Sequence, residues 1–171
     1  MLLYIFSGLP ATGKSTLSSM LARELRAVYL RVDVVEQAMR DAGAKVDGPE
    51  GYIVCYALAS QNLRLGLNVI ADTVNPIPIT REAWRNAAES VKAPFVEIEV
   101  VCSDENEHRQ RVETRAVDIP GLVLPAWEQV IHREYDAWDR DRIVIDTAHQ
   151  TAAESFEQLC QQLEGVRGQI S

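Results

Sequence analysis

Short apolar runs alternate along the chain with longer segments in which apolar residues recur every three or four positions. A short run that is apolar throughout is typical of a strand buried on both faces, whereas the longer period is typical of a helix with one buried face. The alternation predicts an α/β fold in which helices cover both faces of a parallel sheet. The predicted strands are Leu2–Phe6, Ala27–Val32, Leu67–Ala71, Phe95–Val101 and Arg142–Ile145.

The longer segments predict helices. Their clearest periods run over residues 17–25, 84–91, 127–135 and 156–163. Pro125 suits the first position of the third of these helices, where the missing N–H would have no helical partner. Thr151 and Glu154 have the spacing of a capping box and predict the start of the last helix.

Composition limits the classes of function. The 171 residues are 47% apolar and show no internal repeat or long linker, which predicts one domain over residues 1–171. A net charge of −8 disfavours nucleic acid and anionic membranes as partners. Three cysteines without CxxC spacing indicate a reducing compartment and exclude a disulfide framework or structural zinc site. We therefore expect a cytoplasmic protein without a membrane span that acts on a small molecule.

Residues 8–15 match the phosphate-binding motif GxxxxGK[ST], the Walker A motif, in full. Glycines let successive backbone N–H groups point at phosphate oxygens, and the helix that follows adds its positive N-terminal end. Lys14 is expected to reach the β- and γ-phosphates of ATP, and the Ser15 hydroxyl to bind Mg²⁺. The predicted nucleotide-binding residues are Gly8, Leu9, Pro10, Ala11, Thr12, Gly13, Lys14, Ser15 and Thr16.

Two of the predicted strands end in an aspartate, and the carboxyl ends of parallel strands face the ligand crevice. Asp33 could accept the proton of an attacking hydroxyl, but with Glu36 it equally fits a capping box for a helix over Val34–Arg40. Asp72 fits a carboxylate that orients Mg²⁺, although an aspartate before a turn is also common. The residues alone leave both alternatives open.

Two arginines precede an irregular stretch, Ala116–Leu124, which we interpret as a mobile lid within residues 116–136. Arg111 and Arg115 are four residues apart, so on a helix they would share a face that points toward this lid. Guanidinium groups there can stabilise the charge of a phosphoryl-transfer transition state. Pairing of Arg111 with Glu107 on a solvated helix is the alternative.

The other polar residues are expected to be structural. Arg81 and Arg85 are predicted at the surface, and the three histidines have no ligand-like spacing. Thr73 and Asn75 fit either substrate contact or turn formation. The predicted helix Gly51–Leu65 is expected to form part of the wall of an acceptor pocket.

Five segments of the chain carry a resemblance to a known group: GLPATGKST at 8–16, YLRVD at 29–33, VIADT at 69–73, RQRVETR at 109–115 and IVIDT at 143–147. Together they resemble the small P-loop kinases, a group that includes zeta-toxin-like and chloramphenicol phosphotransferases, gluconate kinase and the kinase domain of polynucleotide kinase. The similarity covers nearly the whole chain, with the segments in the same order.

The resemblance implies a three-layer P-loop NTPase fold with a five-stranded parallel sheet in the order 2-3-1-4-5 and a short lid. It also implies that Asp33 is the catalytic base and that Lys14, Arg111 and Arg115 act in catalysis. The loop around Asp146 and Thr147 would lie near the adenine.

The chain departs from the group at two points. Ala11 stands where many members have glycine, and we expect the loop to tolerate this small side chain. The stretch Ala116–Leu124 has no arginine of its own, which leaves more of the transition-state charge to Arg111 and Arg115.

The leading hypothesis is a kinase that moves the γ-phosphoryl group of Mg-ATP to a hydroxyl of a small molecule, with Ser15 and Asp72 holding the metal. One alternative is a nucleic-acid end-kinase, which the net charge disfavours. The other is a non-catalytic switch that signals ATP occupancy. A guanine-nucleotide switch is disfavoured because the chain has no NKxD motif.

Overall fold

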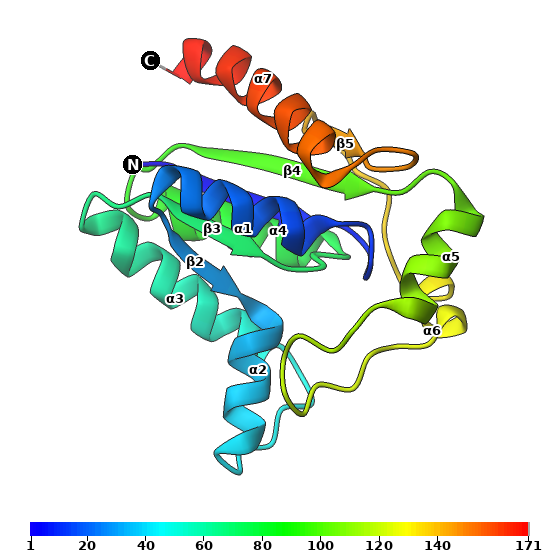
Figure 1. Cartoon of the computed structure of the whole chain (residues 1–171). Coiled ribbons are helices and arrows are strands. Elements are labelled where there is room, and N and C mark those ends of the chain that lie inside the picture. The colour runs from blue at the N-terminus through cyan, green and yellow to red at the C-terminus, as the bar shows by residue number, and fades with distance from the viewer. Residues whose placement is uncertain (171) are drawn as a thin grey trace.

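The computed structural model describes the backbone of residues 1–170 and the side chains as far as Val166. Five parallel strands form one sheet in the order β2-β3-β1-β4-β5, which confirms the predicted topology (Figure 1). The strands are β1 (Leu3–Ser7), β2 (Val28–Arg31), β3 (Val69–Asp72), β4 (Phe95–Val101) and β5 (Ile143–Asp146).

Helices cover both faces of this sheet. One face packs Tyr4 and Phe6 of β1 against apolar residues of α1 and α7, and the other packs Leu3 and Ile5 against α3 and α4. The all-apolar character of β1 follows from burial on both sides. The helices are α1 (Lys14–Leu25), α2 (Val32–Asp41), α3 (Glu50–Arg64), α4 (Pro78–Glu89), α5 (Glu105–Thr114), α6 (Trp127–Ile131) and α7 (Ala152–Ile170).

The carboxyl ends of the central strands meet at one edge of the sheet. Phe6 of β1 and Arg31 of β2 are both in register with Asp72 at the end of β3. β1 runs into the phosphate-binding loop at the same edge, so the loop and Asp72 are neighbours. The topology therefore places the predicted chemistry in one region.

The helix boundaries confirm some predictions and correct others. Thr151 and Glu154 form the predicted capping box, with each side chain bonded to the other residue's backbone N–H. The third predicted helix is wrong beyond Ile131: α6 ends there, and Tyr135 lies outside it, where its hydroxyl donates to Glu99 Oε1 (2.9 Å). Pro125 precedes the cap of α6 rather than opening the helix.

Two arginines predicted at the surface are buried instead. Arg81 is 1% exposed because its guanidinium donates to backbone carbonyls of residues 75, 76, 136 and 137. Arg85 is 3% exposed because it pairs with Glu97 on β4 and with Glu82. The carbonyls that bind Arg81 and the Glu97 carboxylate that binds Arg85 include partners on distant segments, which no local sequence pattern identifies.

The stretch Ala116–Leu124 has no helix or strand, as predicted, and joins α5 to α6 across the carboxyl edge of the sheet (Figure 1). Whether it moves as a lid stays a prediction. Over the described part of the chain, none of the helices combines the length and apolar character needed to span a bilayer.

Candidate functional site

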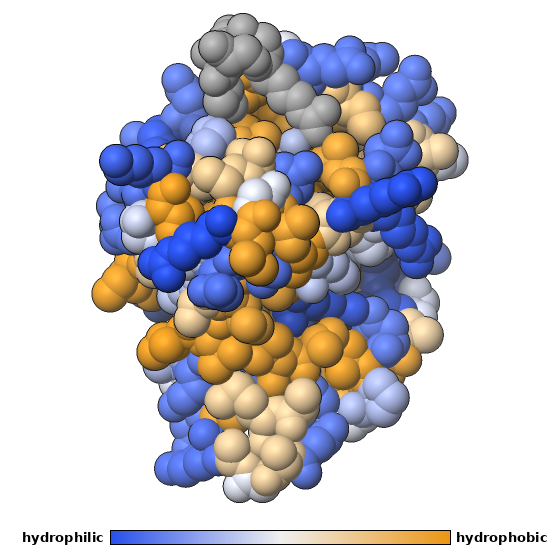
Figure 2. Space-filling model, turned by 90° about the vertical axis from the view of Figure 1, so that its left-hand side faces the viewer, coloured by the Kyte–Doolittle hydropathy of each residue, from blue (hydrophilic) through white to orange (hydrophobic). Residues whose placement is uncertain are grey.

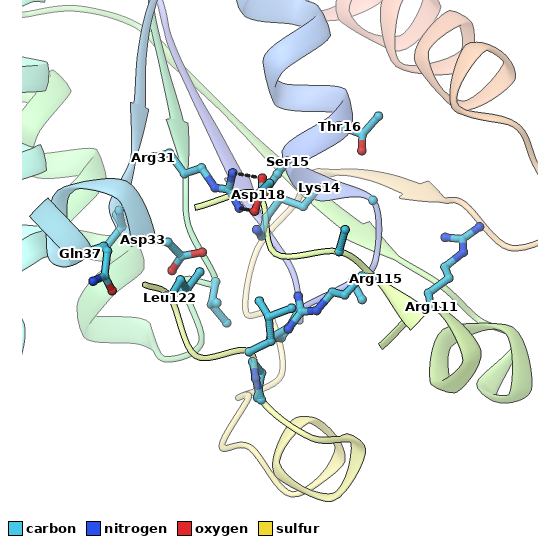
Figure 3. Close-up of a pocket in the computed structure, with 18 of the residues that line it drawn as sticks. Lys14, Ser15, Thr16, Arg31, Asp33, Gln37, Arg111, Arg115, Asp118 and Leu122 are labelled. Atoms are coloured by element: carbon cyan, nitrogen blue, oxygen red, sulfur yellow. Dashed lines mark hydrogen bonds and ion pairs between the residues drawn. The ribbon is translucent and has the colours of Figure 1, made fainter. Parts of the chain in front are cut away.

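A cavity of about 1010 Å³ lies at the carboxyl edge of the sheet. Its walls come from the phosphate-binding loop, α2, the end of α5, the stretch Ala116–Leu124 and the start of α7 (Figure 3). The cavity brings the predicted site residues together. Those that line it are Pro10, Ala11, Gly13, Lys14, Ser15, Thr16, Asp33, Arg111 and Arg115, whereas Gly8, Leu9, Thr12 and Asp72 do not.

The loop has the backbone conformation that its glycines were expected to allow. Gly8 has φ 142°, and a Cβ there would lie 2.2 Å from the Val100 carbonyl oxygen. Gly13 has φ 93° and caps α1 without a side chain, so no side chain covers the first N–H groups of this helix. Ala11 also adopts a left-handed conformation, φ 65°, which glycine accepts more readily. The open helix end therefore fits an anion.

Side chains from distant segments hold this loop. Thr147 donates to the Thr12 carbonyl (2.8 Å), and Thr12 donates to the Leu9 carbonyl (3.0 Å). A ring nitrogen of His108 lies 2.8 Å from the Pro10 carbonyl oxygen, and the ring meets Trp127 edge-on. The sequence analysis gave His108 no role. The structure makes it a brace for the loop, which is fixed by the packing of α5 and α6.

Lys14, which lines the cavity, forms a buried ion pair with Asp72 behind it, 2.9 Å apart. The carboxylate also accepts from the Tyr29 hydroxyl (2.6 Å), and Arg31 lies 3.7 Å away. Burial by itself would raise the pKa of Asp72, but Lys14, Tyr29 and Ser15 hold it below its ordinary value. Asp72 is therefore a carboxylate next to the loop, as the cation role requires.

The donor set at this point fits Mg²⁺. Ser15 offers a hydroxyl and Asp72 a carboxylate, close enough that Ser15 helps to lower the pKa of Asp72, and Mg²⁺ prefers oxygen ligands. Among the described residues no group of three or more His, Cys, Asp or Glu could hold a metal by itself. A cation here would therefore take its other ligands from nucleotide phosphates and water.

Asp33 lies in the first turn of α2 and lines the cavity. The predicted capping box with Glu36 is wrong, because β2 runs directly into α2 and Arg31 takes the cap position. This leaves the Asp33 carboxylate half-buried at the cavity wall rather than bonded to its own helix. Of the two roles that the sequence left open, the structure removes the capping role.

Arg115 faces the same cavity from the other side (Figure 3). Burial lowers the pKa of its guanidinium, and the Asp33 and Asp118 carboxylates oppose that shift. Within residues 1–170, the buried Nε and Nη2 atoms of Arg115 have no hydrogen-bond partner. Because unpaired buried donors are costly, this guanidinium is placed for an anion.

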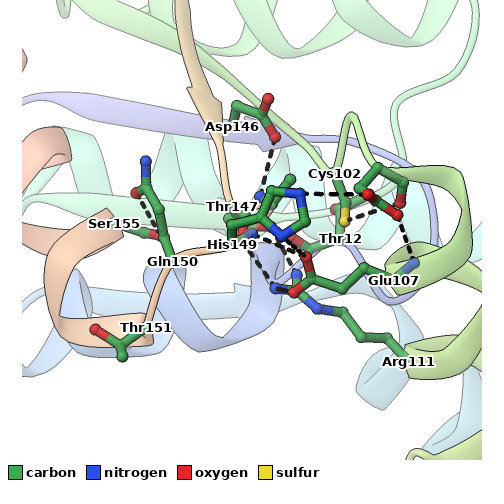
Figure 4. Close-up of polar contacts among 12 residues, drawn as sticks. Thr12, Cys102, Glu107, Arg111, Asp146, Thr147, His149, Gln150, Thr151 and Ser155 are labelled. Carbon is green, nitrogen blue, oxygen red and sulfur yellow. Dashed lines mark hydrogen bonds and ion pairs between the residues drawn. The ribbon is translucent and has the colours of Figure 1, made fainter.

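Arg111 and Arg115 do not share a helical face, contrary to the prediction. α5 ends at Thr114, and Arg115 has an extended backbone with ψ 140°. Arg111 instead donates to the hydroxyl (2.7 Å) and the carbonyl (2.8 Å) of Thr147 and pairs with Glu107 (2.6 Å), as Figure 4 shows. It lines the cavity and joins α5 to the loop after β5.

The loop after β5 contacts the phosphate-binding loop from the far side of the cavity. Thr147 lies 3.4 Å from where a Gly13 Cβ would stand, and Gln150 and Ser155 line the cavity beyond it (Figure 4). Asp146 accepts from the backbone N–H groups of Ser103 and Ala148 (3.0 Å each) and so shapes the turn. The position fits a nucleotide base, which the resemblance implied for this loop.

The segment predicted as a lid is tied to the strands by an ion pair that the sequence analysis missed. Arg31 at the end of β2 pairs with Asp118, whose second oxygen lies 3.2 Å from Arg31 Nη2. Gly121, three residues on, approaches the Gln37 side chain so closely that a Cβ would lie 2.8 Å from its amide nitrogen. The sequence offered one signal for this ion pair: Arg31 is a charged residue at the end of a strand that faces the crevice.

Of the residues after β3, Val74 lines the cavity, whereas Thr73 and Asn75 do not. Asn75 is fully buried with φ 52°, and its side-chain amide donates to the Ser7 hydroxyl (3.1 Å). Tyr52 of α3 does line the cavity, and its hydroxyl accepts from the Asn75 N–H (3.3 Å). Of the two roles proposed for Asn75, turn formation is the one observed.

Solved structures with the same fold cover almost the whole chain. A candidate kinase from Chloroflexus aurantiacus J-10-fl aligns with a TM-score of 0.71 and 22% identity, covering 96% of each chain. An APS kinase from Mycobacterium tuberculosis, in complex with AMPPNP and APS, aligns with a TM-score of 0.67 and 14% identity over 95% of this chain and 96% of that one. A gluconokinase from Sinorhizobium meliloti 1021 aligns with a TM-score of 0.62 and 15% identity over 97% and 95%.

No curated protein sequence matches the chain. At these identities the structural likeness shows the fold, which is the P-loop NTPase fold that the sequence predicted. The AAA domain family (AAA_33) matches residues 3–133, a span that includes the phosphate-binding loop, Asp33, Asp72, Arg111 and Arg115. The chain therefore belongs to this family of AAA domains.

Proposed function

We propose that the protein is a kinase that transfers the γ-phosphoryl group of Mg-ATP to a hydroxyl of a small molecule. One observation carries the proposal: the phosphate-binding loop, the Asp33 carboxylate and the unpartnered Arg115 guanidinium all open into one cavity. A site that only bound nucleotide would not need a carboxylate opposite the loop. The gluconokinase and the APS kinase among the structural neighbours support the same type of reaction.

The loop and Lys14 bind the phosphates in this proposal. The N–H groups at the start of α1 and the Lys14 ammonium would hold the β- and γ-phosphates, and Lys14 would leave Asp72 to do so. Mg²⁺ bound with the nucleotide would supply further positive charge at the transferring phosphoryl group. Ser15 and Asp72 are the residues placed to hold it.

Asp33 accepts the proton of the attacking hydroxyl and holds that hydroxyl in line with the γ-phosphate. Arg115 then stabilises the charge that develops on the transferring group, because its buried donors have no competing partner among the described residues. Arg111 acts differently: its bonds to Thr147 fix the loop that we assign to the base.

The size of the cavity supports a small acceptor. Pockets for one drug-sized ligand run to roughly 1,000 Å³, so a cavity of about 1010 Å³ has room for a nucleotide and only a small second substrate. The wall beyond Asp33 combines polar residues of α2 with apolar residues from the stretch Ala116–Leu124. The three free cysteines fit a reducing compartment, and we propose the cytoplasm as the place of action.

The test is ADP release from Mg-ATP across a panel of hydroxyl-bearing small molecules, with wild type, Asp33→Asn and Lys14→Ala measured in parallel. The proposal predicts release that depends on an acceptor and falls about 10²- to 10⁴-fold in Asp33→Asn, while ATP affinity stays within about threefold. Tight ATP binding with no acceptor stimulation would favour the switch. Stimulation by an oligonucleotide end alone, with strong salt dependence, would favour a nucleic-acid kinase.

A further inference from the structure

Helix α3 carries apolar residues on its outer face as well as on its inner one. Its inner face, with Cys55, Ala59 and Leu63, is fully buried against the sheet and α4. Its outer face carries the exposed residues Ile53 (57% exposed), Val54, Ala57, Leu58 (41% exposed) and Leu65, which we call the α3 face. A helix of this kind is normally covered on both sides.

Figure 2 looks onto the side of the molecule that carries α3 and shows apolar side chains gathered there in a continuous area with a polar margin. Scattered exposed apolar residues are ordinary on a protein surface, whereas a contiguous patch with a polar rim is typical of an interaction site. No residue of the α3 face lines the cavity, although Tyr52 of the same helix does, so the proposed reaction does not explain this face.

We propose that the α3 face binds a second copy of this chain, with the two α3 helices antiparallel across a twofold axis at Ala57. Ala57 is the smallest side chain at the middle of the face, which allows two helices to approach closely there. Ile53 of one copy would then lie opposite Gln61 of the other, one turn from the axis, with Val54 and Leu58 of both copies packed around them.

The charges on α3 are complementary to themselves in this register. Glu50 and Arg64 lie seven residues before and after Ala57, which is two helical turns in each direction, so all three share one side of the helix. A twofold axis at Ala57 places Glu50 of each copy opposite Arg64 of the other. A symmetric interface requires such self-complementarity, whereas an unrelated partner would not.

The size of the face sets the expected affinity. A helix of 15 residues is about 22 Å long, and one helix pair buries less than the roughly 800 Å² per partner of a standard interface. The dimer should therefore be reversible, with a Kd on the order of 10–100 µM. Because α3 carries Tyr52 and packs against α2, dimerisation would also brace the wall that holds Asp33.

Sedimentation velocity of the full chain from about 5 to about 500 µM tests the dimer, since this range brackets the expected Kd. The expected result is a reversible shift from monomer to dimer, with the Kd raised about tenfold or more in Leu58→Glu. Ile79→Glu is the matched control, because Ile79 is 72% exposed but lies on α4, outside the α3 face. Circular dichroism checks that each variant is folded.

Charge reversal tests the register. Glu50→Arg and Arg64→Glu should each weaken the dimer about threefold to tenfold, and the double variant should restore it. Ala57→Cys should form a disulfide-linked dimer under mild oxidation, with the wild-type chain as the control for its three native cysteines. A monomer throughout the concentration range would overturn the proposal. A dimer whose Kd is unchanged in Leu58→Glu and in both charge-reversal variants would also overturn it.

Discussion

Replacing Lys14 should destabilise the protein even without nucleotide, because Lys14 is also the main partner of a buried carboxylate. Lys14 and Asp72 are both nearly inaccessible and 2.9 Å apart. Removing one member of a buried ion pair costs about 3–5 kcal/mol, since the other charge stays buried without its partner. Tyr29 and Arg31 remain beside Asp72, so we expect the lower end of this range, about 3 kcal/mol for Lys14→Ala.

The pH dependence has a definite sign. In the wild type the folded-state pKa of Asp72 is lowered, so its stabilising contribution is present above the ordinary carboxyl pKa and lost as the pH falls through the folded value. In Lys14→Ala the ammonium no longer offsets burial, so the pKa of Asp72 rises. The buried Asp72 charge then destabilises the folded variant at neutral pH, and protonation in acid removes this cost. The difference in free energy of unfolding between wild type and Lys14→Ala should therefore be largest at neutral pH and smaller in acid.

Urea unfolding followed by tryptophan fluorescence measures this difference, and Asp72→Asn completes a double-mutant cycle. Lys14→Ala combined with Asp72→Asn should be more stable than Lys14→Ala alone, because the neutral amide needs no counter-charge. A chain of this size should lose about 5–10 °C in Tm in the single variant. Stability within about 0.5 kcal/mol of wild type, or a difference that widens in acid, would refute the reasoning.

Three further substitutions probe other parts of the site. Arg115→Met should leave the ligand-free protein as stable as wild type in urea, or up to about 1 kcal/mol more stable, since two unpaired buried donors are removed. Acceptor-dependent turnover should fall about 10³-fold. A large loss of stability would contradict this. Ala11→Gly should raise Tm by the equivalent of about 0.5–1 kcal/mol, because φ 65° is strained for alanine; an unchanged or lower Tm would argue against strain. Arg85→Met should cost about 3 kcal/mol in urea unfolding by leaving Glu97 buried without its main partner, and Arg85→Met with Glu97→Gln should recover part of it; equal losses in both would show that packing, not charge, matters there.

The features that the sequence predicted well are encoded locally. The phosphate-binding loop lies within nine residues, and the strands follow from short apolar runs whose observed ends differ by at most two residues from those predicted. Asp72 was found because it ends such a run. The strand order could not come from local pattern and rested on the resemblance to small P-loop kinases, which the sheet confirms.

The features that the sequence missed depend on contacts between distant segments. Arg31 and Asp118 are 87 positions apart, so neither residue signals the other. Arg81 looked like a surface arginine because its partners are backbone carbonyls near 76 and 136, which have no side-chain signature. The capping box at Asp33 failed for a local reason: the pattern fits, but α2 begins at Val32, so Asp33 lies inside the first turn and Arg31 holds the cap position.

The most direct test of the proposed reaction is ³¹P NMR of the enzyme with Mg-ATP and an acceptor that stimulates ADP release. ADP release alone cannot distinguish transfer from hydrolysis, whereas the phosphorus spectrum identifies the product. The account predicts that the γ-phosphorus signal disappears as a phosphate monoester signal of the acceptor grows, and that Asp33→Asn slows both together. Inorganic phosphate as the only product, or ester formation that is unchanged in Asp33→Asn, would contradict it.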